Sequence, residues 1–86
     1  MIEKLTPENL HEFIYNYPTK HQYGFMGSET NEILEKYEID KDKFYDALGV
    51  NTCMIIDGEI LNYHCDIELA LRCVLEDRDK NLSEWD

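Results

Sequence analysis

An Asp-Gly pair between two β-prone runs constrains this 86-residue chain more than any other feature. Asp57 and Gly58 readily adopt the positive φ angles that a two-residue hairpin turn requires. The runs beside the pair are Thr52–Ile56 and Glu59–Tyr63. With this turn, the facing pairs are Ile56 with Glu59, Ile55 with Ile60, and Cys53 with Asn62. A two-stranded hairpin is not stable alone, so we expect it to pack on helices.

The two faces of the predicted hairpin differ in character. Strand alternation places on the more apolar face Thr52, Met54, Ile56, Leu61 and Tyr63. The other face carries Cys53, Ile55, Ile60, Asn62 and His64. This second face brings Cys53 and His64 together, which bears on metal binding.

Helical periodicity fills most of the remaining sequence. The predicted N-caps are Thr6, Ser28, Asp40 and Asp66. Pro18 ends the first helix because proline disfavours helical geometry in the residue before it, and Gly49 ends the third. The predicted inward-facing side chains are Leu10, Phe13, Ile14, Tyr17, Ile33, Leu34, Tyr37, Phe44, Ala47, Leu48, Ile67, Ala70, Leu71, Val74 and Leu75. Three helices, a hairpin and a C-terminal helix predict one compact α+β domain.

The chain length predicts a single domain over residues 1–86, with residues 81–86 as a loose C-terminal tail. A hydrophobic fraction of 43% suffices for a core despite the high charge. No apolar run approaches the about 18 residues of a membrane helix, and no secretory signal pattern opens the chain. These features favour a cytoplasmic protein, whose cysteines are thiols or metal ligands rather than disulfides.

Acidity is the largest deviation in composition. Nineteen Asp and Glu against eight Lys and Arg give a net charge of −11, which repels nucleic acid and anionic membranes and attracts basic protein surfaces. The carboxylates predicted to contact a partner are Glu29, Glu32, Glu35, Glu38, Asp40, Asp42 and Asp46. The alternative is that this series is an ordinary solvated helix face that serves solubility.

Aromatic residues supply candidate apolar contacts. Residues 19–27 are expected to form a loop that carries Tyr23 and Phe25, and the tail carries Trp85. We favour packing of the loop aromatics into the core, because a small domain needs such side chains there. As contacts for a partner, the candidates are Tyr23, Phe25 and Trp85.

Three cysteines and a histidine suggest a structural zinc site. Cys53, His64, Cys65 and Cys73 lie within 21 residues, and three thiolates with one imidazole are a common zinc ligand set. His21 is an alternative ligand. One ion would then clamp the hairpin to the last helix. The competing interpretation is that Cys53 and Cys73 are small buried hydrophobic residues and His64 is a surface residue.

No catalytic constellation is evident in the sequence. Cys65 follows His64, but neighbouring residues of a strand point to opposite faces, so the imidazole is badly placed to activate the thiol. Ser28 and Ser83 occupy a predicted cap and the tail, and no glycine-rich phosphate loop is present. We therefore expect a protein that is not an enzyme and has no small-molecule substrate.

In general type, the chain resembles small acidic phage-encoded inhibitors of the anti-CRISPR and anti-restriction classes. The resemblance rests on the length, the charge of −11, and the acidic series from Glu29 to Asp46 beside Tyr23 and Phe25. It implies a stoichiometric inhibitor that blocks a nuclease complex sterically, without turnover. Some members of that class carry structural metal.

These observations predict a binding inhibitor of a nucleic-acid-processing protein, with a CRISPR effector nuclease as the expected target. The acidic surface would occupy a basic channel and prevent nucleic-acid loading. The alternative is a small regulatory or adaptor subunit, of the antitoxin or immunity type, that binds through an apolar surface. A metal-dependent enzyme is a third possibility, but the sequence has no H-E-x-x-H element.

Overall fold

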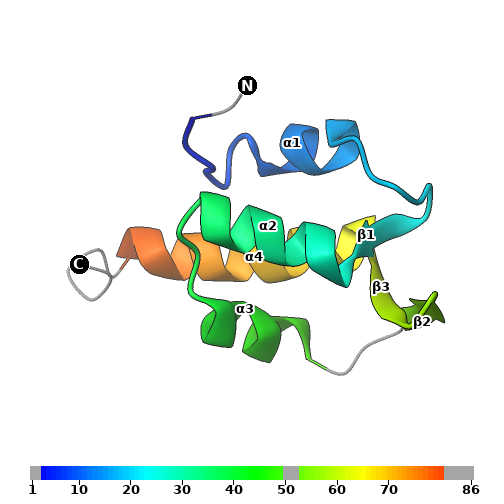
Figure 1. The fold of residues 1–86 in the computed structure, drawn as a ribbon. Coiled ribbons are helices and arrows are strands. Elements are labelled where there is room, and N and C mark those ends of the chain that lie inside the picture. Colours follow the sequence, from blue (N-terminus) through cyan, green and yellow to red (C-terminus); the bar gives the residue numbers. More distant parts are fainter. Residues whose placement is uncertain (1–2, 50–52, 81–86) are drawn as a thin grey trace.

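The computed structural model describes residues 3–49 and 53–80. Its elements are α1 (Leu10–Asn16), β1 (Gly24–Met26), α2 (Gly27–Lys36), α3 (Lys41–Leu48), β2 (Cys53–Ile56), β3 (Glu59–Tyr63) and α4 (His64–Lys80) (Figure 1). The radius of gyration is 12.5 Å, near the about 12 Å expected of a compact chain of this length. The predicted α+β domain is confirmed, whereas the predicted tail at 81–86 lies outside the described residues.

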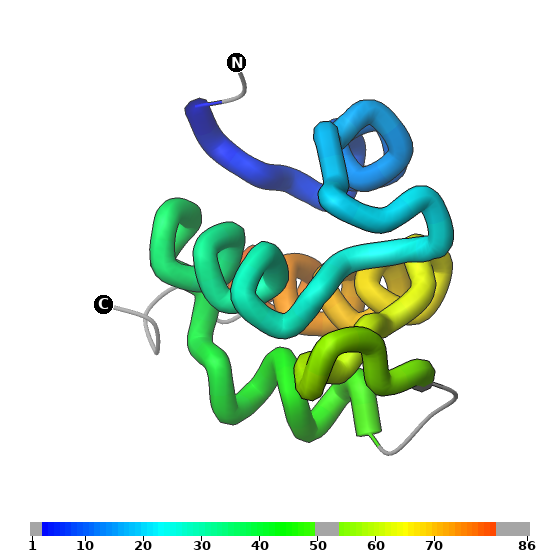
Figure 2. Tube along the Cα trace, turned by 45° about the vertical axis from the view of Figure 1, so that its right-hand side comes forward, coloured from blue at the N-terminus to red at the C-terminus, as the bar shows by residue number. Residues whose placement is uncertain are grey.

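Helix α4 is the centre of the fold. It packs against α1 and against α3, and it also contacts β1 and β3. Figures 1 and 2 show α1 above and α3 below a middle layer in which α2 lies in front of α4. The small sheet closes one end of this arrangement. Helix α4 thus joins α1, α3 and the sheet, while α2 packs on β1 and β3.

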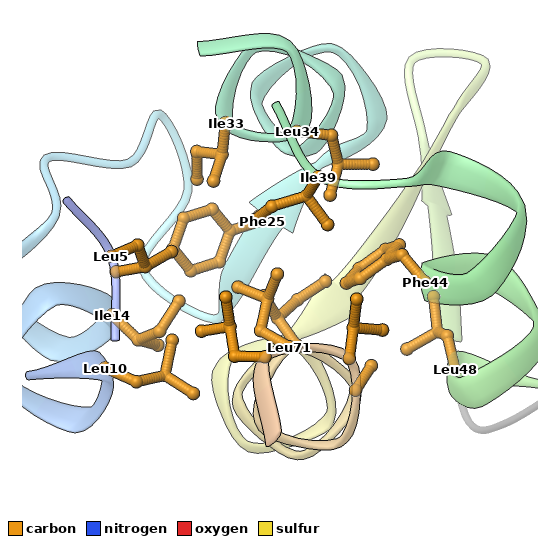
Figure 3. Close-up of a cluster of buried hydrophobic side chains, with 14 residues drawn as sticks. Leu5, Leu10, Ile14, Phe25, Ile33, Leu34, Ile39, Phe44, Leu48 and Leu71 are labelled. Atoms are coloured by element: carbon orange, nitrogen blue, oxygen red, sulfur yellow. The ribbon is translucent and has the colours of Figure 1, made fainter. Parts of the chain in front are cut away.

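The hydrophobic core fills the space between these elements (Figure 3). Phe25 of β1 and Phe44 of α3 are completely buried, and burial of a phenylalanine contributes about 2–3 kcal/mol to stability. The predicted inward positions that are buried are Leu10, Ile14, Ile33, Leu34, Phe44, Leu48, Ile67, Ala70, Leu71, Val74 and Leu75. Phe13, Tyr17 and Tyr37 are half-buried against this core. Ala47 is exposed, so its predicted inward position is wrong.

The hairpin forms in the predicted register. Cys53 pairs with Asn62, Ile55 with Ile60, and Ile56 with Glu59. In the turn, Asp57 has φ 51° and Gly58 has φ 82°. Both values lie in the left-handed region that a type I′ turn demands, which is why Asp-Gly specifies it.

Strand β1 lies in the segment predicted as a loop. It pairs antiparallel with β3, so the strand order is β1-β3-β2 and β3 is the central strand. Gly24 is required at this contact, because a Cβ atom there would lie 2.1 Å from the backbone oxygen of Asn62. A strand of three residues is too short to show alternation, and its partner lies far away in sequence.

The helix starts differ from most of the predicted caps. Asp40 caps α3 as predicted, accepting a hydrogen bond from the N–H of Lys43 at 3.1 Å. Thr6 and Asn9 instead exchange backbone-to-side-chain hydrogen bonds, which close a turn before α1. Helix α2 starts at Gly27, and α4 starts at His64 directly after β3. Ser28 and Asp66 therefore lie inside helices.

None of the helices in the described ranges combines the length and the apolar character that a membrane span needs.

Candidate partner-binding surface

The acidic series of α2 does not share one face of the helix. Successive residues are rotated by about 100°, so a spacing of three turns each next glutamate by about 60°. Glu29 points inward and is only 5% exposed. Its carboxylate accepts the N–H of Lys20 at 2.9 Å and the N–H of Met26 at 3.0 Å. Glu29 is therefore a structural residue, and its prediction as a partner contact is wrong.

The rest of the acidic series is exposed. The exposed carboxylates on and beside α2 and α3 are Glu32, Glu35, Glu38, Asp40, Asp42 and Asp46. Asp40 serves as the cap of α3, and Glu35 pairs with Lys41 at 3.0 Å. Within the described ranges, no ion pair neutralises Glu32, Glu38, Asp42 or Asp46. These four carboxylates leave the region strongly negative.

The arginines do not offset this charge, because they tie α4 to the N-terminal segment. Arg72 donates to the carbonyl of Pro7 at 3.1 Å and to the carboxylate of Glu68 at 3.0 Å. Arg78 donates to the carbonyl of Leu5 at 2.9 Å. Both arginines are thus held in intramolecular contacts, and Arg78 also pairs with Asp79 at 3.8 Å. Neither arginine pairs with the described carboxylates on α2 and α3.

The candidate aromatic contacts separate clearly. Phe25 is completely buried in the core, so it cannot be a surface contact, and its alternative assignment to the core is the correct one. Tyr23 is 54% exposed, and its ring lies 5.1 Å from that of His21. Trp85 lies outside the described residues. Tyr23 alone keeps its place among the candidate contacts that the structure describes.

A groove of about 550 Å³ lies between α1 and the C-terminal end of α2. Phe13, Tyr17 and Tyr37 line it, and the Phe13 ring lies 5.4 Å from each of the two tyrosine rings. Glu12 also lines the groove. Burial, assisted by the carboxylate of Glu32, raises the pKa of Tyr17. Lys36 lines it as well, on the side of Tyr37. The groove therefore joins aromatic surface to one carboxylate and one ammonium group.

Helix α4 divides the candidate zinc ligands. His64 and Cys65 are its first two residues, and Cys73 follows two turns later. The helical rise puts about 12 Å between the Cα atoms of Cys65 and Cys73, whereas a zinc–sulfur bond is about 2.3 Å long. Cys73 therefore cannot share an ion with His64 or Cys65, and the predicted four-ligand clamp needs correction. Cys73 is also exposed, which excludes the competing buried position.

The remaining candidate ligands do not form a site by themselves. The ring of His64 packs on Tyr15 and Phe25, with ring centroids 5.6 and 5.2 Å apart. Among the described side chains, no group of three or more His, Cys, Asp or Glu residues is arranged to hold a metal ion, and neither His21 nor His64 belongs to one. The side chain of Cys53 lies outside this described set. Zinc binding stays a prediction, and it now depends on Cys53.

The hairpin exposes two isoleucines that are not among the predicted contacts with a partner. Ile55 is 74% exposed and Ile60 is 51% exposed, and the two residues face each other across the hairpin. The predicted alternation had already placed them on one face. Their exposure depends on which helices cover that face, and a local pattern does not contain that information.

The chain matches no protein-family model, no curated protein and no solved structure.

Proposed function

We propose that this protein is a non-enzymatic inhibitor that binds a basic surface of a nucleic-acid-processing protein, with a CRISPR effector nuclease as the expected target. The observation that carries the proposal is the set of exposed carboxylates that have no ion pair within the described ranges, Glu32, Glu38, Asp42 and Asp46, while both arginines are held in intramolecular contacts. Such a surface accelerates encounter with a basic channel and competes there with nucleic acid.

The groove between α1 and α2 supplies the anchor that charge alone lacks. Exposed charges mainly increase association rates, whereas affinity comes from desolvated aromatic and arginine contacts. An arginine or lysine of the partner would pack over Phe13 and Tyr17, with Glu12 as its counter-charge. Lys36 lies 5.7 Å from the centre of the Tyr37 ring, so the incoming cation is expected at the other two rings.

Inhibition assays with matched charge-reversal variants test the proposal. The acidic-groove variant carries Glu12→Lys in the groove, with Glu32→Lys and Glu38→Lys among the carboxylates that carry the proposal. The control carries Glu3→Lys, Glu8→Lys and Glu76→Lys, all at exposed positions. Each set of three reversals adds six charges and changes the net charge from −11 to −5. The two variants therefore differ in the position of the charge and not in its amount.

The assay measures RNA-guided DNA cleavage by a panel of purified CRISPR effector nucleases. The protein should inhibit at about one molecule per nuclease when it is added before nucleic acid, and less when it is added afterwards. The acidic-groove variant should need at least about tenfold more protein, which corresponds to about 1.4 kcal/mol, while the control stays near wild type. Equal losses of inhibition in both variants would show that the net charge, and not its position, determines inhibition. Inhibition of no nuclease in the panel would reject the target class.

A further inference from the structure

Asn62, in the central strand, is a buried polar residue whose side chain has no hydrogen-bond partner among the described residues. It is 9% exposed. Its backbone lies opposite Phe25 of β1 and Cys53 of β2. A buried amide that lacks a partner costs about 1–3 kcal/mol, so its retention here calls for a ligand or an ordered water.

Asn62 lines a cleft of about 460 Å³ between the hairpin, the start of α2 and α3. Uncharged polar groups line most of it, including Ser28 and Asn31 of α2 and Tyr45 of α3. The one charged group among the described residues of its lining is the carboxylate of Glu59, which accepts the N–H of Ser28 at 3.1 Å. The Tyr45 hydroxyl donates to Oδ1 of Asn31 at 2.7 Å, which leaves the Nδ2 donors of Asn31 available. The cleft therefore offers amide and hydroxyl groups that both donate and accept.

An apolar strip continues the cleft along the hairpin. Ile60 lines the cleft, and Ile55 lies directly across the ladder from it. Both side chains are more than half exposed. A small polar metabolite would leave this strip uncovered, whereas an extended peptide would place its main chain at the amides and an aliphatic side chain on the isoleucines.

We propose that this cleft binds an extended peptide segment of a partner protein. The side-chain amide of Asn62 pairs with a main-chain peptide group, because each offers one N–H donor and one carbonyl acceptor. An aliphatic side chain of the segment covers Ile55 and Ile60. Asp57 and Glu59, at the turn beside the strip, favour basic residues on either side of that aliphatic residue.

A second copy of the chain is a poor occupant for this cleft. Each copy has a net charge of −11, so two copies repel each other, and Asp57 and Glu59 would meet the same carboxylates on the other copy. The proposed peptide site does not rest on the inhibitor function. Its ligand is recognised through the ligand's own main-chain peptide groups, whereas the inhibited protein would be recognised at the groove beside Glu12.

The test is a nuclear magnetic resonance titration of the full chain, labelled with ¹⁵N and ¹³C. The probes are acetylated and amidated pentapeptides that alternate Lys or Arg with Val, Ile or Leu. Each peptide is paired with a copy that is N-methylated at its central residue. Members that bind should shift the side-chain amide of Asn62 and the methyl groups of Ile55 and Ile60. N-methylation should weaken the binding of these peptides at least about tenfold, because it removes a main-chain N–H donor without changing the charge.

Three variants separate recognition from folding. Asn62→Leu should bind the best peptide at least about tenfold less tightly while its melting temperature is maintained, since an apolar group of similar shape needs no partner. Ile60→Thr should weaken binding, whereas Leu69→Thr should not, because Leu69 is 63% exposed on α4 and does not line the cleft.

Three results would overturn the peptide site. The first is that no member of the panel shifts the Asn62 amide. The second is equal affinity of the methylated and unmethylated peptides, or of N62L and wild type, which would leave Asn62 as a hydrated structural residue. The third is sedimentation of the free protein as a dimer that Ile60→Thr dissociates, which would assign the strip to self-association. Because the acidic-groove variant retains this cleft, loss of nuclease inhibition and loss of peptide binding are separately measurable.

Discussion

The carboxylate of Glu29 accepts the backbone N–H of Met26 at 3.0 Å, across the junction where β1 ends and α2 begins. The second oxygen of the same carboxylate accepts the N–H of Lys20 at 2.9 Å. One buried acid therefore fixes both the approach to β1 and the first turn of α2. Most carboxylates of such an acidic chain are expected on its surface, whereas the carboxylate of Glu29 has a structural role in the interior.

Replacement of this acid should be costly. We predict that Glu29→Ala lowers the free energy of unfolding by about 3 kcal/mol, because two hydrogen bonds to a charged group are lost at a buried site. Glu32→Ala, one turn along the same helix and exposed, should change it by no more than about 0.5 kcal/mol. Urea denaturation of both variants measures the difference. Equal effects would contradict the structural role of Glu29.

The two glycines around β1 should respond differently to the same change. A Cβ atom on Gly24 would lie 2.1 Å from the carbonyl oxygen of Asn62, whereas on Gly27 its nearest neighbour is 3.7 Å away. Gly24→Ala should therefore separate β1 from β3 and destabilise the protein by about 3 kcal/mol or more, as other strained substitutions do. Gly27→Ala should be neutral or stabilising by about 0.5–1 kcal/mol, because alanine is preferred in a helix. Similar melting temperatures for the two variants would show that β1 does not approach β3 closely.

The pair formed by Glu68 and Arg72 should make stability depend on pH. Burial opposes ionisation of Glu68, but hydrogen bonds from His11 and Arg72 outweigh it and hold the pKa below the usual 4.5. A lowered pKa in the folded state stabilises the protein above about pH 4.5, and that contribution is lost as the pH falls through the folded pKa. Glu68→Gln should thus cost about 1 kcal/mol at pH 7 and progressively less below pH 4.5.

Unfolding curves of E68Q and wild type at several pH values measure this difference. Glu76→Gln, an exposed substitution on the same helix, serves as the control and should change stability little at any pH. A difference for E68Q that stays constant down to pH 3 would contradict the assignment.

Zinc binding can be tested with substitutions of Cys53, in β2, and of Cys73, in α4. We predict that zinc purified with the chain depends on Cys53 together with His64 or Cys65, and that Cys73→Ser leaves the zinc content unchanged. Cys53→Ser should remove both the metal and the fall in melting temperature on chelation. Elemental analysis and thermal melts provide the readouts. Zinc loss in C73S would contradict the helix geometry, and a metal-free, stable wild type would end the zinc prediction.

The features that the sequence predicts well are local ones. The hairpin register follows from Asp57-Gly58 because the turn fixes which residues face each other. Strand β1 could not be predicted in the same way, because its pairing with β3 joins Phe25 to Asn62, 37 positions later, and no short-range pattern encodes it. Glu29 illustrates the same limit. The sequence pattern indicates a surface acid, but the carboxylate is buried where it accepts the N–H of residue 20, nine positions earlier.

The candidate contacts show a related division. The predicted acidic surface is largely exposed, because short-range composition sets the polarity of helix faces. The apolar contacts could not be placed, because exposure depends on how elements assemble. Phe25 is buried in the core, with the rings of Tyr17 and His64 against it, while Ile55 remains exposed on the hairpin.

The direct passage from β3 into α4, without an intervening loop, also has a kinetic consequence. Residues 53–80 make their mutual contacts at short sequence separation, so the hairpin and the following helix can order together as one cooperative unit. Strand β1 must close a loop of 37 positions before it gains any pairing energy. We therefore expect the β1 edge to pair with β3 after the hairpin has formed, and hydrogen exchange should show the amide protons of β1 exchanging before those of the central strand.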